Sequence, residues 1–114
     1  MSKDIKALKT VIWNIRVTKE DKESFMRKCR NVGFKNSSEA FRTLLKRAQT
    51  SEDIIKNMQT SKLALSYINS RGECIAISVR ITEKEKQNFI KLCEATHYTP
   101  AKVARAIIVN WCDS

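Results

Sequence analysis

The sequence predicts a mainly helical protein with one two-stranded antiparallel β-ribbon, built from two strand–helix–helix repeats that share one core. The first observation is an internal repeat, because Ile15–Thr18 (IRVT) returns as Val79–Thr82 (VRIT) and the same offset of 64 residues continues beyond it. The second and third are an alternating apolar segment and a helix-start signal at the same place in each copy. Because the repeat occurs only twice, it indicates a fused dimer rather than a solenoid.

The repeat aligns residues of like type along both helices of each copy. After one deleted residue the offset becomes 63. A half of roughly 40–45 residues rarely builds a sufficient core by itself. We therefore expect the halves, 11–48 and 73–114, to complete one core between them. The aligned pairs of like type include Phe25 with Phe89, Cys29 with Cys93 and Arg42 with Arg105, whereas the copies differ at Gly33 with His97 and at Ser37 with Pro100.

Each copy begins with a short segment of alternating character. Successive side chains of a strand point to opposite faces, so each segment predicts a strand with one buried face and one outward face. The buried faces comprise Trp13, Ile15, Val17, Ile77, Val79 and Ile81. The outward faces comprise Ile12, Asn14, Arg16, Ala76, Ser78 and Arg80.

Helix-start signals follow both strands. Thr18-x-x-Asp21 and Thr82-x-x-Glu85 have the pattern of capping boxes. Gly33 suits the end of the first helix, whereas His97, at the same place in the second copy, predicts some other ending. The first helices carry an apolar stripe of Phe25, Cys29 and Val32, or Phe89, Cys93 and Thr96.

A second helix is predicted in each copy. Asn36 or Ser37 is a suitable cap for one, and Thr99-Pro100 opens the other with proline at a first-turn position that needs no N–H. Pro100 also removes a backbone donor there. The expected buried faces are Ala40, Phe41, Leu44, Leu45 and Ala48 in one helix, and Val103, Ile107, Ile108 and Trp111 in the other.

Residues 49–72 read as a linker that is partly helical. Ser51–Asp53 is a helix-start signal, Ile54, Ile55 and Met58 suit a short amphipathic helix, and Leu63–Ile68 fits helix or strand, with helix preferred. Ahead of the first repeat, residues 1–10 form a basic arm with Lys3, Lys6 and Lys9.

The chain is strongly basic. It has 22 Lys and Arg against 12 Asp and Glu, a formal charge of +10. Residues 1–50 carry +8 of this and residues 73–114 only +1. Such an excess suits a polyanion, with nucleic acid first and an anionic membrane second, although a merely soluble basic protein has the same composition.

The cysteines and the single histidine argue against a metal site or an enzyme. The four cysteines form no C-x-x-C pair, and Cys29 and Cys93 suit buried free thiols. One histidine and scattered carboxylates cannot assemble a nucleophile, base and metal cluster. We therefore expect no catalysis and no cofactor. The lack of a long apolar run or signal peptide favours a cytoplasmic protein without a membrane partner.

This order of elements resembles the ribbon-helix-helix (MetJ/Arc-type) DNA-binding fold. Trp13–Val17 (WNIRV) before a helix, followed by Ser38–Arg42 (SEAFR), has that family's pattern. The resemblance covers nearly all of the chain outside the linker, and the order and duplication of short motifs carry it. Two copies in one polypeptide are similar to the tandem arrangement of TraY-like proteins, accessory factors that bind the transfer origin of conjugative plasmids.

The resemblance implies that the ribbon enters the major groove of double-stranded DNA and reads base edges. Arg16 and Arg80 then suit guanine, Asn14 suits adenine, and Ser78 serves either role. Ile12 and Ala76 are poor hydrogen-bonders that touch a thymine methyl or lie outside the groove. The expected base contacts are Ile12, Asn14, Arg16, Ala76, Ser78 and Arg80. The expected phosphate contacts are Lys19, Lys22, Lys35, Ser37, Ser38, Thr99 and Ala101, with Lys3, Lys6 and Lys9 as additions.

Several alternatives stay open on sequence alone. Arg16 and Arg80 also suit solvated charges on an exposed strand, and Arg42 and Arg105 suit structural contacts or solvated charges. The biological role is a relaxosome accessory at a transfer origin, with a relaxase or other conjugation protein as partner, or a transcriptional regulator of plasmid or mobile-element genes. Further copies of the chain on adjacent DNA sites are another expected partner. The competing class is a helical protein-protein interaction module with only non-specific affinity for nucleic acid. The unequal copies predict an asymmetric DNA target.

Overall fold

The computed structural model describes residues 10–60 and 75–113. The predicted arm with Lys3, Lys6 and Lys9, the segment Leu63–Ile68 and Cys74 lie outside these residues. Within them the chain forms five helices and one two-stranded sheet, which confirms the mainly helical fold with an antiparallel ribbon. The elements are β1 (Thr10–Val17), α2 (Lys19–Val32), α3 (Ser37–Arg47), α4 (Ser51–Thr60), β2 (Ile75–Thr82), α6 (Glu83–Thr96) and α7 (Pro100–Asp113).

The ribbon has the alternation that the sequence predicts. β1 pairs with β2 antiparallel, and Asn14 lies opposite Ser78 at the centre of the register. Ile12 lies opposite Arg80 on one side of this pair, and Arg16 lies opposite Ala76 on the other. The inner side chains Ile15, Val17, Ile77, Val79 and Ile81 are buried.

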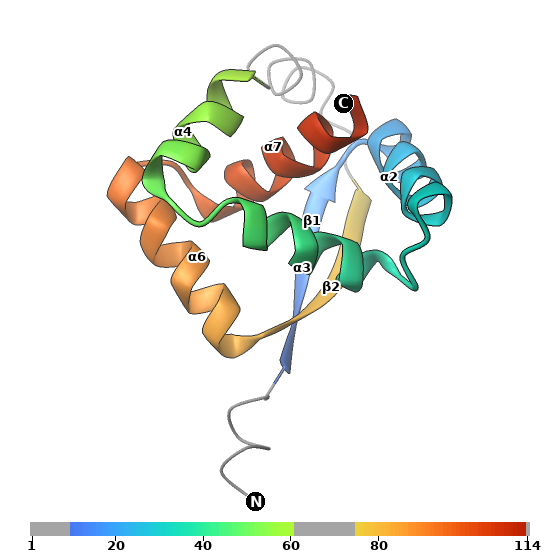
Figure 1. Cartoon of the computed structure of the whole chain (residues 1–114), viewed down its shortest axis with the longest axis horizontal. Coiled ribbons are helices and arrows are strands. Elements are labelled where there is room, and N and C mark those ends of the chain that lie inside the picture. The colour runs from blue at the N-terminus through green and yellow to red at the C-terminus, as the bar shows by residue number, and fades with distance from the viewer. Residues whose placement is uncertain (1–9, 61–74, 114) are drawn as a thin grey trace, which may run out of the picture.

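The helices lie on the inner side of the ribbon and at its flanks. In Figure 1, α2 and α6 lie on opposite flanks of the ribbon, while α3 and α7 pass across it. Trp13, only partly buried, inserts its ring between the two halves. Its centroid lies 5.8 Å from that of Phe41 and 5.5 Å from that of Phe89, both in edge-to-face arrangements. Residues from both halves therefore fill one core.

Both predicted helix-start signals cap a helix, but only the one at α6 forms a complete capping box. Thr82 and Glu85 form a complete capping box, in which the Glu85 N–H donates to the Thr82 hydroxyl and Glu85 accepts from the Thr82 N–H. At α2 the Thr18 hydroxyl accepts from the Asp21 N–H at 3.1 Å, which is one half of that arrangement. Asn36, one of the two residues considered, caps α3 by accepting from the Glu39 N–H.

The prediction of a different ending at His97 is wrong. Gly33 ends α2 in the left-handed conformation with φ 99°, and His97 ends α6 in the same conformation with φ 65°. Both ends repeat the same backbone bonds, since Phe34 N–H donates to Cys29 O and Tyr98 N–H donates to Cys93 O. The helix-end geometry therefore recurs at the cost of a strained histidine backbone.

One further expectation about packing needs correction. Val32, expected on the apolar stripe of α2, is 56% exposed, because the helix ends there and Gly33 turns the chain away. Helix α4 is the amphipathic helix expected within the linker, and its Ile54 is fully buried and its Met58 is 9% exposed. It packs against α6 and α7 as part of the core. Thr50 caps it through mutual bonds with Asp53.

Candidate nucleic-acid interface

The outward face of the ribbon is a band of exposed side chains. All six predicted base-contact residues are exposed and follow one another in three cross-strand pairs. Arg80 stands beside Ile12 at one end and Arg16 beside Ala76 at the other, so the two guanidinium groups lie diagonally across the ribbon. Ile12 is 60% exposed, which makes it a large apolar side chain on an otherwise polar face. The structure brings these residues together as predicted.

The centre of this face holds a contact that the sequence reading missed. The Ser78 hydroxyl donates to Asn14 Oδ1 at 2.6 Å. Both residues are exposed, and both lie in the middle pair of the register. The 64-residue offset aligns these same two residues, so it would have identified them as the centre of a symmetric ribbon. Direct cross-strand neighbours are close enough for such side-chain bonds.

The first turn of α3 is fastened to the outer edge of β2. The Ser38 hydroxyl accepts from the Arg80 N–H at 2.7 Å, and the Ser37 hydroxyl donates to the Ser78 carbonyl at 3.5 Å. These bonds satisfy backbone groups of an edge strand that would otherwise face solvent. Both serines are half-buried. They therefore position α3 against the ribbon, a role the sequence reading did not assign to them.

The matching edge of β1 is held differently. Arg105 Nε donates to the Arg16 carbonyl at 2.6 Å, which confirms a structural contact for Arg105. Ala101 and Pro100 take the places of Ser38 and Ser37 and have no hydroxyl to offer. Ala101 and Thr99 are exposed at the start of α7. The outer edges of β2 and β1 are thus held by different groups, by serine hydroxyls at β2 and by the Arg105 guanidinium at β1.

The lysines predicted to contact phosphate lie around this face and differ in exposure and in the bonds they already make. Lys19 and Lys35 are exposed near the starts of α2 and α3. Lys22 is half-buried, and its ammonium donates to the Ala76 carbonyl at 3.1 Å. Lys86, aligned with Lys22 by the repeat but not predicted as a contact, lies with Nζ 5.9 Å from the centroid of the Trp13 ring. Acidic Glu39 also lies in the first turn of α3, which weakens the positive field there.

A groove of about 700 Å³ runs between the Ile12–Arg80 end of the ribbon and α3. Ser38 and Asn36 line it near the start of α3, and Arg42 and Lys46 line it farther along. This end of the ribbon therefore presents the strand side chains, the start of a helix and basic residues to one open space.

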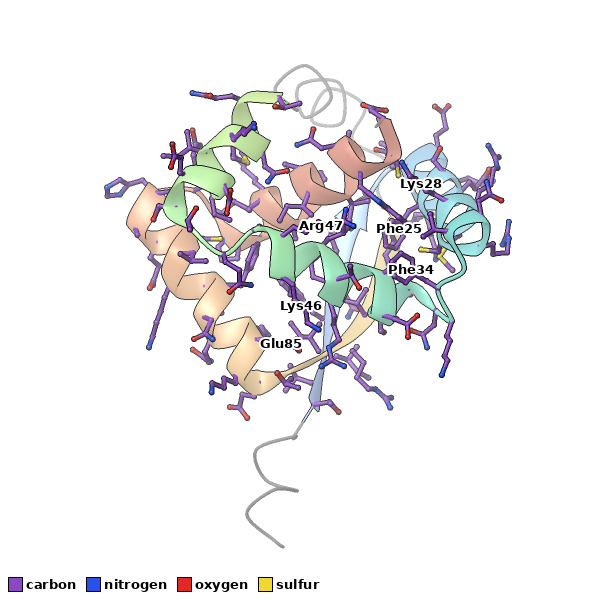
Figure 2. All side chains as sticks on the ribbon, in the orientation of Figure 1. Phe25, Lys28, Phe34, Lys46, Arg47 and Glu85 are labelled. Carbon is purple, nitrogen blue, oxygen red and sulfur yellow. The ribbon has the colours of Figure 1, made fainter. Side chains whose placement is uncertain are left out.

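Arg42 joins the two halves beside this groove. Its Nε lies 3.1 Å from Glu85 Oε1, and Glu85 lies at the start of α6 (Figure 2). Partial burial opposes ionisation of Glu85, but bonds from the Thr82 N–H and hydroxyl and from Arg42 outweigh it and hold the pKa of the carboxyl below its ordinary value. The structural role expected for Arg42 is confirmed.

A second aromatic cluster lies between α2 and the end of α7. Phe25 and Phe34 lie close together beside α2 in Figure 2, with ring centroids 5.5 Å and 6.0 Å from that of Trp111. Lys28 Nζ lies 5.1 Å from the Trp111 ring centroid and donates to the Trp111 carbonyl. This lysine is therefore a structural group and does not belong to the ribbon face.

The cysteines that the structure describes are free thiols, and their raised pKa values favour the unreactive protonated form. Cys29 and Cys93 are buried, as predicted, and Cys112 is half-buried. Burial raises the pKa of Cys29 and raises that of Cys93 to about 11. For Cys112, burial and then the charge of Asp21 raise the pKa to about 11. Residues 10–60 and 75–113 contain no group of three or more His, Cys, Asp or Glu placed to hold a metal ion.

Comparison with known proteins does not place the chain in a family. No family model, no curated protein and no solved structure matches the chain. In the part of the chain that the structure describes, no helix has the length and apolar character needed to cross a membrane.

Proposed function

We propose that this protein binds double-stranded DNA sequence-specifically, with the ribbon of β1 and β2 in the major groove. The observation that carries the proposal is the outward face itself, where Arg16, Arg80, Asn14 and Ser78 are all exposed on a narrow two-stranded element. A major groove admits such a ribbon and offers base-edge acceptors that guanidinium groups bind in a bidentate way. Arg16 and Arg80 are the proposed guanine readers.

We infer that the chain is a tandem ribbon-helix-helix protein in which the two halves act as a fused dimer. The register supports this, because residues aligned by the 64-residue offset occupy equivalent positions about the Asn14–Ser78 pair. Ile12 opposite Arg80 and Arg16 opposite Ala76 are such equivalent pairs. The matched left-handed helix ends at Gly33 and His97 also support it.

Phosphate binding is proposed for the groups that border the ribbon. Lys19 and Lys35 are exposed there, and the first turn of α3 presents backbone N–H groups beside the Arg80 end. The α7 end lacks the N–H of Pro100 and the two serine hydroxyls. Together with the charge of +8 on residues 1–50 against +1 on residues 73–114, this favours an asymmetric site with stronger phosphate binding on the first-copy side.

We propose a role in plasmid or mobile-element biology because the tandem arrangement resembles that of TraY-like proteins. A relaxosome accessory at a transfer origin is the preferred role, and a transcriptional regulator is the second. Exposed apolar residues in and after α4 would support the competing protein-interaction module, and two of them, Ile54 and Met58, are buried in the core. Ile55, 39% exposed, remains outside the core, and Leu63 and Leu65 lie outside the described residues.

The test is selection of a binding sequence from random double-stranded DNA, followed by affinity measurements with Arg16→Ala and Arg80→Ala. We expect each variant to lose about 1–3 kcal/mol of discrimination at one base position. Binding of the intact protein should weaken steeply with salt, because phosphate contacts release counterions.

Arg47→Ala is the matched control. It removes the same charge from an exposed position in the last turn of α3, away from the ribbon face. We expect a small, sequence-independent loss of affinity. If Arg47→Ala and Arg16→Ala behave alike on the selected site, or if selection yields no preferred sequence, groove reading by the ribbon is wrong.

A further inference from the structure

Two different residues, Asn14 and Ser78, face each other in the middle of the ribbon, and the hydrogen bond between them has one direction. A hydroxyl has one hydrogen, and Ser78 donates it to Asn14 Oδ1 across 2.6 Å. The hydroxyl oxygen of Ser78 is then left as an acceptor, and the Asn14 amide nitrogen is left with two donor hydrogens. The exposed centre of the ribbon therefore presents donors on the β1 side and an acceptor on the β2 side.

We propose that the Asn14–Ser78 pair reads a single G·C base pair in a fixed orientation at the centre of the target, with guanine facing Asn14 and cytosine facing Ser78. This rests on the proposed function. Guanine offers N7 and O6, both acceptors, in the major groove, and cytosine offers the N4 donor. A ribbon lying along the groove sets its strands side by side across the groove's width, so Asn14 and Ser78 face opposite DNA strands.

The pair departs from the simpler expectation that Asn14 reads adenine. Adenine reading needs both a donor and an acceptor from one amide. Asn14 Oδ1 has a second lone pair, but its bond from the Ser78 hydroxyl holds this oxygen toward β2 and leaves the amide nitrogen to face a base. Guanine matches the donor edge that remains, whereas adenine would meet it with its own N6 donor.

The position of Ser78 is itself fixed by the fold. Its carbonyl accepts from the Ser37 hydroxyl at 3.5 Å, and the neighbouring edge group, the Arg80 N–H, donates to Ser38 at 2.7 Å. Pro100 takes the place of Ser37 on the Asn14 side and lacks a hydroxyl. The acceptor side of the pair is thus anchored to α3, and the donor side has no equivalent serine.

This arrangement makes the centre of the target directional. In a symmetric dimer the two central residues are identical, so they cannot distinguish G·C from C·G. Here they differ, while both flanking arginines remain in equivalent positions. Asn14 and Ser78 are therefore specificity-determining residues that set the orientation in which the protein binds its site. An accessory or regulatory protein needs a single orientation when it acts on one side of that site.

The decisive experiment exchanges the two residues in the full-length chain as the double variant N14S/S78N. The composition of the ribbon is unchanged, and unfolding curves check that the variant folds. Affinities are measured on the selected site and on copies in which only the central base pair is changed to C·G, A·T or T·A. We expect the intact protein to prefer G·C by about 3- to 10-fold, the effect of one or two base-edge hydrogen bonds.

The exchange should reverse that preference to C·G while the flanking sequence stays the same. Ser78→Ala should reduce the preference for G·C over A·T at the centre to less than about 2-fold, because it frees the Asn14 amide, while leaving the flanking arginine positions selective. Arg47→Ala, which leaves the ribbon intact, should retain the full preference for G·C. If the exchange leaves the central preference unchanged, or if the intact protein selects A·T at the centre, the pair does not read DNA in this way.

The failure of this inference is distinguishable from failure of the proposed function. A preferred sequence that depends on Arg16 and Arg80 but has an indifferent or unreversed centre overturns only the central reading. An intact protein without any preferred sequence overturns DNA reading by the ribbon as a whole.

Discussion

Arg42 Nε lies 3.1 Å from Glu85 Oε1, so an ion pair joins α3 of the first half to the first turn of α6 in the second. Glu85 also completes the capping box of α6 through the Thr82 N–H at 2.8 Å. One carboxylate thus serves both the start of a helix and the contact between halves. The aligned residues, Asp21 and Arg105, are arranged differently, since Arg105 donates to the Arg16 carbonyl.

Glu85→Gln should lower the free energy of unfolding at neutral pH by about 1 kcal/mol, because glutamine keeps the capping acceptor but lacks the charge that pairs with Arg42 and interacts favourably with the start of α6. The folded protein lowers the pKa of Glu85. Its stabilising contribution is therefore present above the unfolded pKa and is lost as pH falls through the folded value. Urea unfolding at pH 7 and in acid measures this. The variant and the parent protein should converge in acid, and an equal difference at both pH values would exclude the carboxylate as the cause.

Glu83→Gln is the control for that experiment. Glu83 lies in the same first turn of α6 but is exposed. Exposed substitutions away from specific contacts usually change stability by less than about 0.5 kcal/mol. We expect a small effect without a distinct acid dependence.

Ile54→Ala should destabilise the protein far more than Ile55→Ala. Ile54 is fully buried between α4 and the rest of the core, whereas its neighbour Ile55 is 39% exposed. Truncating a buried isoleucine costs about 2–5 kcal/mol, and the exposed neighbour should cost less than about 1 kcal/mol. Thermal or urea unfolding of both variants gives the comparison. Equal losses would mean that α4 does not belong to the core.

His97→Gly should stabilise the protein by about 0.5 kcal/mol. His97 holds φ 65° and is exposed, so the substitution relieves a left-handed backbone without removing a buried side chain. Gly33→Ala should do the reverse and cost about 1 kcal/mol. A Cβ at Gly33 would meet no atom within 4 Å, so its cost is one of conformation alone. Chemical denaturation measures both, and a destabilised His97→Gly would show that the imidazole makes a needed contact.

Cys93 should resist alkylation in the folded protein. Its side chain is fully buried and its pKa is raised to about 11, so little thiolate is present or accessible at neutral pH. Cys112, half-buried, should react earlier than Cys93 because reagent can reach it. Peptide mapping after timed iodoacetamide treatment, with and without denaturant, measures the order. Equal rates for Cys93 in both conditions would contradict its burial.

The elements of this fold follow closely from the sequence, because each depends on contacts between near neighbours in the chain. The alternation from Trp13 to Val17 and its repeat from Ile77 to Ile81 predict the two strands and their buried faces. Thr82-x-x-Glu85 predicts a capping box that the structure contains. His97 was misjudged because a glycine preference was read as a requirement, whereas histidine tolerates the left-handed conformation at a moderate cost.

The strands, the helices and the residues of the outward face can be predicted from the amino-acid sequence, because periodicity and capping are properties of local sequence, and the duplication predicts that the two strands pair antiparallel. How that face is held depends on tertiary packing. The bonds from the Arg80 N–H to the Ser38 hydroxyl, from Arg105 to the Arg16 carbonyl and from Ser78 to Asn14 join residues 42, 89 and 64 positions apart. No local pattern encodes such bonds, since they depend on where packing of the core places one element against another.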